Sequence, residues 1–116
     1  MAMIDELVPF GIDVNDAMER FAGSMALYEK MLKKLPENVA KLDAVTPFRA
    51  GDYGTALANA HTMKGLTGNL SITPLFNAYN QAVTLFRAEK PMEAGAEIEK
   101  IIPLQNQIVT IIAKYL

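Results

Sequence analysis

The sequence predicts an all-α protein, and two observations support this prediction. Apolar residues recur at the three- and four-residue spacing of a helix face through most of the chain. No stretch shows the two-residue alternation of a half-buried strand, and the sequence contains no Asn-Gly or Asp-Gly hairpin turn. A chain of 116 residues forms one domain. We therefore expect a single up-down-up-down antiparallel four-helix bundle with a short additional N-terminal helix.

The first expected helix is the short one, and Gly23 ends it. Its apolar face is formed by Val14, Ala17, Met18 and Phe21. A second helix begins near Ser24, and its apolar stripe resumes beyond Pro36 and reaches Val45. Pro36 and Pro47 interrupt this stretch, so the sequence leaves the helix boundaries open here.

The second long helix is expected from about residue 53 to about residue 71. Gly51 and Asp52 predict its start, because glycine ends a preceding segment and an aspartate side chain accepts hydrogen bonds from the first free helical N–H groups. Its expected core face consists of Leu57, Ala60, Met63, Thr67 and Leu70.

Thr73 as N-cap and Pro74 at the first helical position predict the start of the third long helix. Its core face is expected to contain Leu75, Ala78, Tyr79, Ala82, Leu85 and Phe86. A turn at residues 89–91 leads into the last helix, which Pro103 is expected to kink or split. The apolar stripe of that helix consists of Ile98, Ile101, Ile102, Gln105, Ile108, Val109, Ile112 and Leu116.

The composition excludes several classes of function. The formal net charge of −2 argues against a nucleic-acid partner, since neutralising phosphates requires clustered Lys and Arg. The chain has no cysteine, so it has no disulfide framework and no thiolate metal site. No apolar run is long enough to span a bilayer, and the acidic N-terminus is unlike a secretory signal. We expect a cytoplasmic protein with no membrane partner and no metal site of its own.

The single histidine of the chain lies in the middle of the helix expected over residues 53–71. At helical spacing, one stripe of this helix is formed by His61, Lys64, Gly65 and Gly68. A glycine inside a helix costs about 1 kcal/mol relative to alanine, so two glycines cost about 2 kcal/mol. We therefore expect the stripe to be kept bare so that another protein or a tetrahedral group can approach the imidazole.

This stripe favours phosphoryl transfer. An exposed imidazole is a nucleophile, and the flexible ammonium of Lys64, one turn away, can neutralise a phosphoryl group. Little else is needed from a phosphoryl carrier, because catalysis of this reaction is mostly positioning and charge neutralisation. The sequence contains no P-loop, no Gly-rich dinucleotide loop and no kinase signature. We expect no ATP site, so the phosphoryl group must come from another protein.

The string Ala-His-Thr-Met-Lys-Gly at residues 60–65, followed by small residues and Asn69, resembles the signature of the histidine-containing phosphotransfer (HPt) domain family of two-component phosphorelays. Residues 11–14, 32–35 and 51–53 are also similar to that family, and the resemblance covers residues 11–116.

The resemblance implies that His61 is the phosphoacceptor and that Lys64 supports the phosphoryl charge. It also implies that Ala58, Gly65 and Gly68 belong to the partner-docking surface. The implied partners are receiver domains of response regulators or hybrid histidine kinases, and Mg²⁺ is expected in the receiver's acidic pocket. The implied oligomeric state is a monomer.

Three positions depart from the family pattern. Leu66 stands where a small residue is common, and Ser71 stands where glycine is frequent. In several family members a glutamine of the following helix orients the imidazole; Gln81 is the nearest candidate here, although the matching register places Val83 there. Three alternatives stay open: a helical adaptor that docks receivers without being phosphorylated, the phosphoacceptor domain of a chemotaxis-type histidine kinase, and a plain helical interaction module in which His61 is incidental.

Overall fold

The computed structural model describes residues 2–116, and within that range the regular structure is helical apart from one isolated β-bridge between Ile12 and Ile72. The predicted all-α class is confirmed. The helices are α1 (Ala2–Leu7), the 3-10 helix η1 (Val8–Phe10), α2 (Val14–Arg20), α3 (Met25–Leu32), α4 (Leu35–Lys41), α5 (Val45–Arg49), α6 (Tyr53–Asn69), α7 (Thr73–Arg87) and α8 (Pro91–Ala113).

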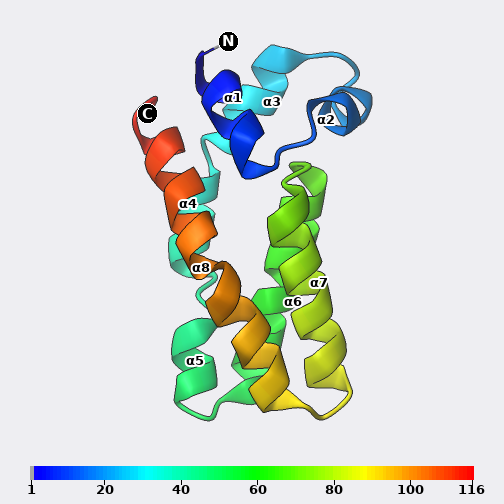
Figure 1. The fold of residues 1–116 in the computed structure, drawn as a ribbon, viewed down its shortest axis with the longest axis vertical. Helices are drawn as coiled ribbons and strands as arrows, with labels where there is room; N and C mark the ends of the chain where they lie inside the picture. The colour runs from blue at the N-terminus through cyan, green and yellow to red at the C-terminus, as the bar shows by residue number, and fades with distance from the viewer. Residues whose placement is uncertain (1) are drawn as a thin grey trace.

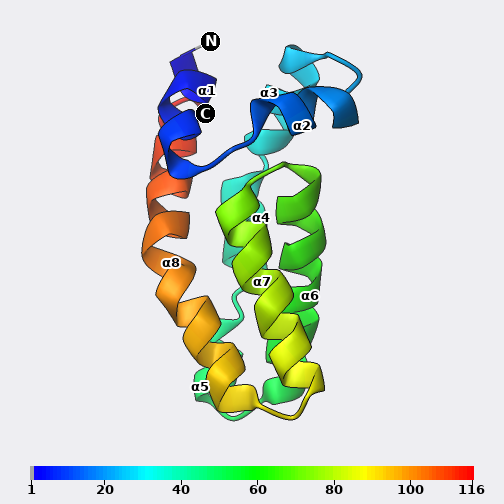
Figure 2. The same ribbon diagram turned by 45° about the vertical axis from the view of Figure 1, so that its right-hand side comes forward.

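The three long helices α6, α7 and α8 pack antiparallel in chain order, and α7 lies against both of the others (Figure 1). The chain first passes along the molecule through α4 and α5, which contact α8, and α5 also contacts α6. Helices α1, α2 and α3 gather at the end where α6 turns into α7, and both chain termini lie at that end (Figure 2).

Side chains from all three long helices form the centre of the core. Helix α6 contributes a narrow buried stripe, and the residues predicted for it at positions 60, 63, 67 and 70 are buried. Of the stripe predicted for α8, the buried members are Ile98, Gln105, Ile108 and Ile112. Leu116 is 72% exposed, so its assignment to the core face was wrong: α8 ends at Ala113, three residues earlier. Within residues 2–116 no helix has the length and apolar character needed to cross a membrane.

Helix α1 is an element that the periodicity did not predict. It has six residues, of which Met3, Ile4 and Leu7 are buried, and it packs against α8. The Glu6 carboxylate accepts hydrogen bonds from Lys114 and Tyr115 near the end of the chain. Six residues span less than two turns, which is too short for a helical period to be recognised.

The helix expected to begin near Ser24 is three short helices. The first of them begins at Met25, next to the predicted start near Ser24, and Ser24 caps it, because its Oγ accepts a hydrogen bond from the amide of Leu27 at 3.2 Å. Pro36 lies in the first turn of α4, and the Asp43 carboxylate accepts hydrogen bonds at the start of α5, including one from the amide of Val45 at 2.8 Å. These two starts divide the expected helix into α3, α4 and α5.

Two other boundaries differ from the prediction. Thr73 is the first residue of α7 and does not cap it; the N-cap is Ile72, whose side chain makes no capping hydrogen bond. Pro103 does not split α8, which continues as one helix from Pro91 to Ala113. Because proline has no N–H, the carbonyl of Glu99 loses its usual helical partner.

Gly95 gives a direct test of the packing between α5 and α8. It is buried, and a Cβ atom built on it would lie 2.1 Å from Cζ of Phe48. We expect Gly95→Ala to lower the free energy of unfolding by about 1–3 kcal/mol, because the Phe48 ring must be displaced.

Chemical denaturation measures this effect, and Gly54→Ala is the matched control. A Cβ atom at Gly54 meets only Asp52 Oδ1, at 3.9 Å. Equal stability of the two variants would contradict the packing of Phe48 on Gly95.

Candidate functional site

Helix α6 carries the candidate site, and Asp52 fixes its N-terminus. The Asp52 carboxylate accepts hydrogen bonds from the amide of Thr55 at 3.1 Å and from the Thr55 hydroxyl at 2.7 Å. The hydroxyl and amide of Thr55 hold the pKa of Asp52 below its usual value. Gly51 precedes the cap with φ of +78°, a conformation that favours glycine. The stop and cap predicted at residues 51 and 52 are confirmed.

The C-terminal end of α6 is held by the N-terminal helices. The hydroxyl of buried Tyr28 donates to the carbonyl of Leu70 at 2.7 Å. Ser71 follows with φ of +55°, and its hydroxyl donates to Asp16 Oδ2 at 2.7 Å. Arg20 Nε donates to the same oxygen at 2.8 Å, and the bonds from Arg20 and Ser71 lower the pKa of Asp16. These contacts tie α2 and α3 to the α6–α7 turn.

His61 lies near the middle of α6 with both ends of the helix fixed in this way. The residue is exposed, although Ala60 and Met63 close to it in the helix are buried. Within residues 2–116 the His61 side chain has no hydrogen-bond or ion-pair partner. The imidazole is therefore accessible from solution, and both ring nitrogens are open to an incoming group.

Lys64 lies one turn further along α6 and is half-buried. Five ion pairs join other described residues, and Lys64 is in none of them. Its ammonium group therefore carries a positive charge that no carboxylate of residues 2–116 neutralises by direct contact. A charge in this state can be used by a bound anion at the neighbouring imidazole.

Gly65 leaves open space beside His61. It is exposed, and a Cβ atom built on it would meet no other group within 4 Å. Packing inside the protein thus gives no reason for glycine at this position of a helix, where it costs about 1 kcal/mol relative to alanine. The expectation of a bare surface next to the imidazole agrees with this geometry.

Gly68 is bare for a different reason. A Cβ atom at Gly68 would lie 2.9 Å from Cδ1 and 3.2 Å from Cε1 of Phe76, so the ring of α7 packs directly on the glycine. The protein's own packing therefore requires a small residue at Gly68, which the expectation of a stripe kept bare for a partner did not include. Sequence reasoning missed Phe76, and its only signal was an aromatic residue shortly after the α6–α7 turn.

The two glycines are expected to respond differently to alanine. Gly65→Ala gains helix propensity in open space, so the free energy of unfolding should rise by up to about 1 kcal/mol. Gly68→Ala must displace Phe76, so it should be less stable than Gly65→Ala by about 1 kcal/mol or more. Thermal and urea unfolding of both variants measure the difference, and equal stability of the pair would contradict the packing of Phe76 on α6.

The remaining candidates are Ala58 on α6 and two residues of α7, Gln81 and Val83. Ala58, one turn before His61, is exposed. Gln81 is also exposed, but within residues 2–116 it makes no hydrogen bond to His61. It follows Phe76 by five residues, which places it about 140° around α7 from the face that packs on Gly68. Val83 is buried and apolar, so it cannot orient the imidazole by hydrogen bonding.

In the described part of the chain, no group of three or more His, Cys, Asp or Glu side chains is arranged to hold a metal ion. Comparisons of the chain with family models, with curated proteins and with solved structures find no significant match. Within residues 2–116, the candidate site consists of an exposed and unpartnered imidazole, an ammonium one turn away that no carboxylate contacts, and an open surface at Gly65.

Proposed function

We propose that the chain is a histidine phosphotransfer protein of a two-component phosphorelay, with His61 as the phosphoacceptor. The observation that supports this most is the exposure of His61 beside the open surface at Gly65. A histidine with only a packing role would have neighbours on this side, and a helix without a docking partner would gain stability from a residue larger than glycine at position 65.

The proposed reaction is balanced without any further reagent. The unprotonated ring nitrogen of His61 attacks the phosphorus atom of an aspartyl phosphate on a receiver domain. The P–N bond forms while the P–O bond to the aspartate breaks, and the aspartate leaves as a carboxylate. In the second transfer a different receiver's aspartate attacks phosphorus, and the imidazole leaves with its ring proton unchanged. Mg²⁺ bound in the receiver neutralises charge on the transferring group.

Lys64 and Gly65 have separate roles in the proposed transfer. The Lys64 ammonium supports the phosphoryl oxygens as a point charge once the group is on His61. Gly65 lets the receiver's backbone come close enough for the in-line geometry, in which the reacting atoms start about 3–3.5 Å apart. Ala58 extends the proposed docking surface along α6, whereas the Phe76 ring covers Gly68 at the edge of that surface. The chain acts as a monomer in this proposal.

The proposal includes a four-helix bundle as the architecture that carries His61. Helices α6, α7 and α8 supply three members of an up-down-up-down four-helix bundle. The succession α4 and α5 takes the place of the fourth, with α1, α2 and α3 as additions at one end. This arrangement presents the middle of α6, and His61 with it, on the outside of the molecule.

Supplying the phosphoryl group from two kinds of donor tests the proposal. One reaction contains phosphorylated receiver domains with Mg²⁺, and the other contains ATP with the ATP-binding domain of a histidine kinase; intact-mass spectrometry detects the adduct. We expect an adduct from at least one receiver and none from the kinase domain. An adduct from the kinase domain alone would assign the chain to the phosphoacceptor class of chemotaxis-type kinases. Receiver binding without an adduct would make it a docking adaptor.

A further inference from the structure

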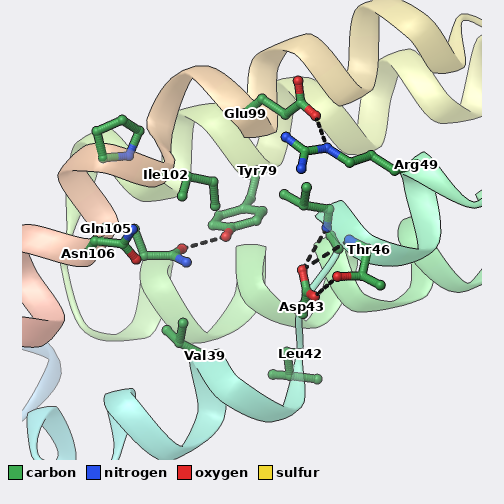
Figure 3. A pocket seen from close by; sticks show the side chains of 13 residues that line it. Val39, Leu42, Asp43, Thr46, Arg49, Tyr79, Glu99, Ile102, Gln105 and Asn106 are labelled. Carbon is green, nitrogen blue, oxygen red and sulfur yellow. Dashed lines mark hydrogen bonds and ion pairs between the residues drawn. The ribbon is translucent and has the colours of Figure 1, made fainter.

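A cavity of about 460 Å³ lies between α4, α5, α7 and α8, away from His61 (Figure 3). Asn59 marks the side of α6 that faces this region, because its Nδ2 donates to the carbonyl of Asp43 at 2.8 Å. His61 comes two residues later, about 200° further around the helix. The cavity and the proposed phosphoacceptor therefore lie on opposite sides of α6.

The walls of the cavity combine apolar and polar side chains, and its base carries a hydrogen-bonded polar pair. Val39, Leu42, Val45 and Ile102 contribute to the walls. At the base, the hydroxyl of Tyr79 donates to Oε1 of Gln105 at 2.5 Å. Burial raises the pKa of Tyr79 to about 12, so this hydroxyl remains a donor at neutral pH.

Within residues 2–116, the side-chain amide nitrogen of Gln105 has no hydrogen-bond partner. Gln105 is 4% exposed, and the one hydrogen bond of its side chain in that range is the one that Oε1 accepts. No fully buried side-chain nitrogen or oxygen among the described residues lacks a partner, so the small exposed area of Gln105 includes Nε2. In Figure 3 the amide group extends from α8 toward Tyr79, inside the cavity. Two N–H donors thus reach the cavity without an acceptor from residues 2–116, so a molecule bound there can accept a hydrogen bond from them.

The charges at the mouth favour a neutral occupant. Arg49 Nε donates to Glu99 Oε1 at 2.8 Å. The Asp43 carboxylate accepts hydrogen bonds from the amide of Val45 and the hydroxyl of Thr46 at the start of α5. An anion would meet the carboxylates of Asp43 and Glu99, and a cation would meet the donors of Gln105 at the base. An uncharged molecule avoids both conflicts.

We propose that this cavity binds an uncharged small molecule with an apolar body and a carbonyl oxygen, which accepts a hydrogen bond from Gln105 Nε2. The apolar body packs between Val39, Leu42 and Ile102. Ligand pockets generally combine apolar area with polar groups that fix the orientation of the ligand, and the lining of this cavity supplies both.

Acetophenone is a suitable probe, and three analogues of similar size are its controls: benzoate is an anion, phenylethylamine is a cation, and ethylbenzene lacks the acceptor. In a two-dimensional NMR titration we expect acetophenone to bind saturably and to shift the Gln105 amide and the methyl groups of Val39, Val45 and Ile102. Each control should bind about fivefold or more weakly. Absence of saturable binding would mean a cavity filled only by water and would overturn the proposal, as would equal binding of ethylbenzene.

Two variants distinguish binding of acetophenone in this cavity from binding elsewhere on the protein surface. Ile102→Phe fills the cavity and is expected to abolish acetophenone binding. Gln105→Met in a Tyr79→Phe background removes the donor and leaves no unpaired hydroxyl; its affinity should fall about fivefold or more relative to Tyr79→Phe alone. Unchanged affinity in Ile102→Phe, with circular dichroism reporting an intact fold, would place the probe elsewhere and overturn the proposal.

Discussion

His61→Gln is expected to take up no phosphoryl group from any receiver while keeping the fold of the natural chain. Glutamine has the size and polarity for the position, but its amide nitrogen is not a nucleophile at neutral pH. The His61 side chain is exposed and unpartnered within residues 2–116, so its loss removes no contact that supports the fold. The free energy of unfolding should change by no more than about 0.5 kcal/mol.

Transfer and folding are measured on the same His61→Gln sample. Intact-mass spectrometry after incubation with a phosphorylated receiver reports the phosphoryl group, and urea unfolding reports stability. A receiver-binding measurement by calorimetry is the control, because docking should persist when only the nucleophile is removed. Phosphoryl uptake by His61→Gln at the rate of the natural chain would rule out His61 as the acceptor.

Gly65→Leu is expected to have the second largest effect, through the partner's approach. A side chain at position 65 would enter space in which nothing lies within 4 Å of the built Cβ atom. The fold should therefore be at least as stable as before, with a helix propensity gain of about 0.5–1 kcal/mol. The leucine would stand between the imidazole and the receiver, and displacement of the reacting atoms by about 1 Å can reduce a rate by about 10²-fold.

Ala96→Leu is the matched control for Gly65→Leu. Ala96 is an exposed residue of α8, a helix that carries none of the proposed docking residues. We expect its transfer rate to equal that of the natural chain, whereas Gly65→Leu should fall by about 10²-fold or more. Stopped-flow or quenched-flow transfer from a phosphorylated receiver measures both. Equal transfer rates for the two variants would contradict a role for the open surface at Gly65 in receiver docking.

Much of the helical framework could be predicted because the helical period is long enough to recognise in the long elements. The α6 stripe from Ala60 to Leu70 is buried as expected, and Asp52 caps that helix. Shorter elements lack this signal: α1 has six residues, and α4 and α5 begin at local features, Pro36 and Asp43, inside what resembled one stripe.

The residues of the candidate site could be predicted only in part, for a different reason. Spacing along one helix places His61, Lys64 and Gly65 on a single face, but it does not show what a neighbouring helix brings against that face. Gly68 belongs to the same stripe in sequence, and it is the Phe76 ring of α7 that gives it a packing role. The polar pair of Tyr79 and Gln105 was likewise hidden, because both residues occupy core positions of their helices.

The most direct test of the central claim is the chemical stability of the phosphoryl adduct on the natural chain. After transfer from a receiver domain with Mg²⁺, intact-mass spectrometry is repeated on portions held in acid and in alkali. A phosphoryl group on the His61 imidazole is expected to be lost in acid and kept in alkali. An adduct that survives acid, or no adduct with any receiver, would contradict the claim that this chain carries phosphoryl groups on His61.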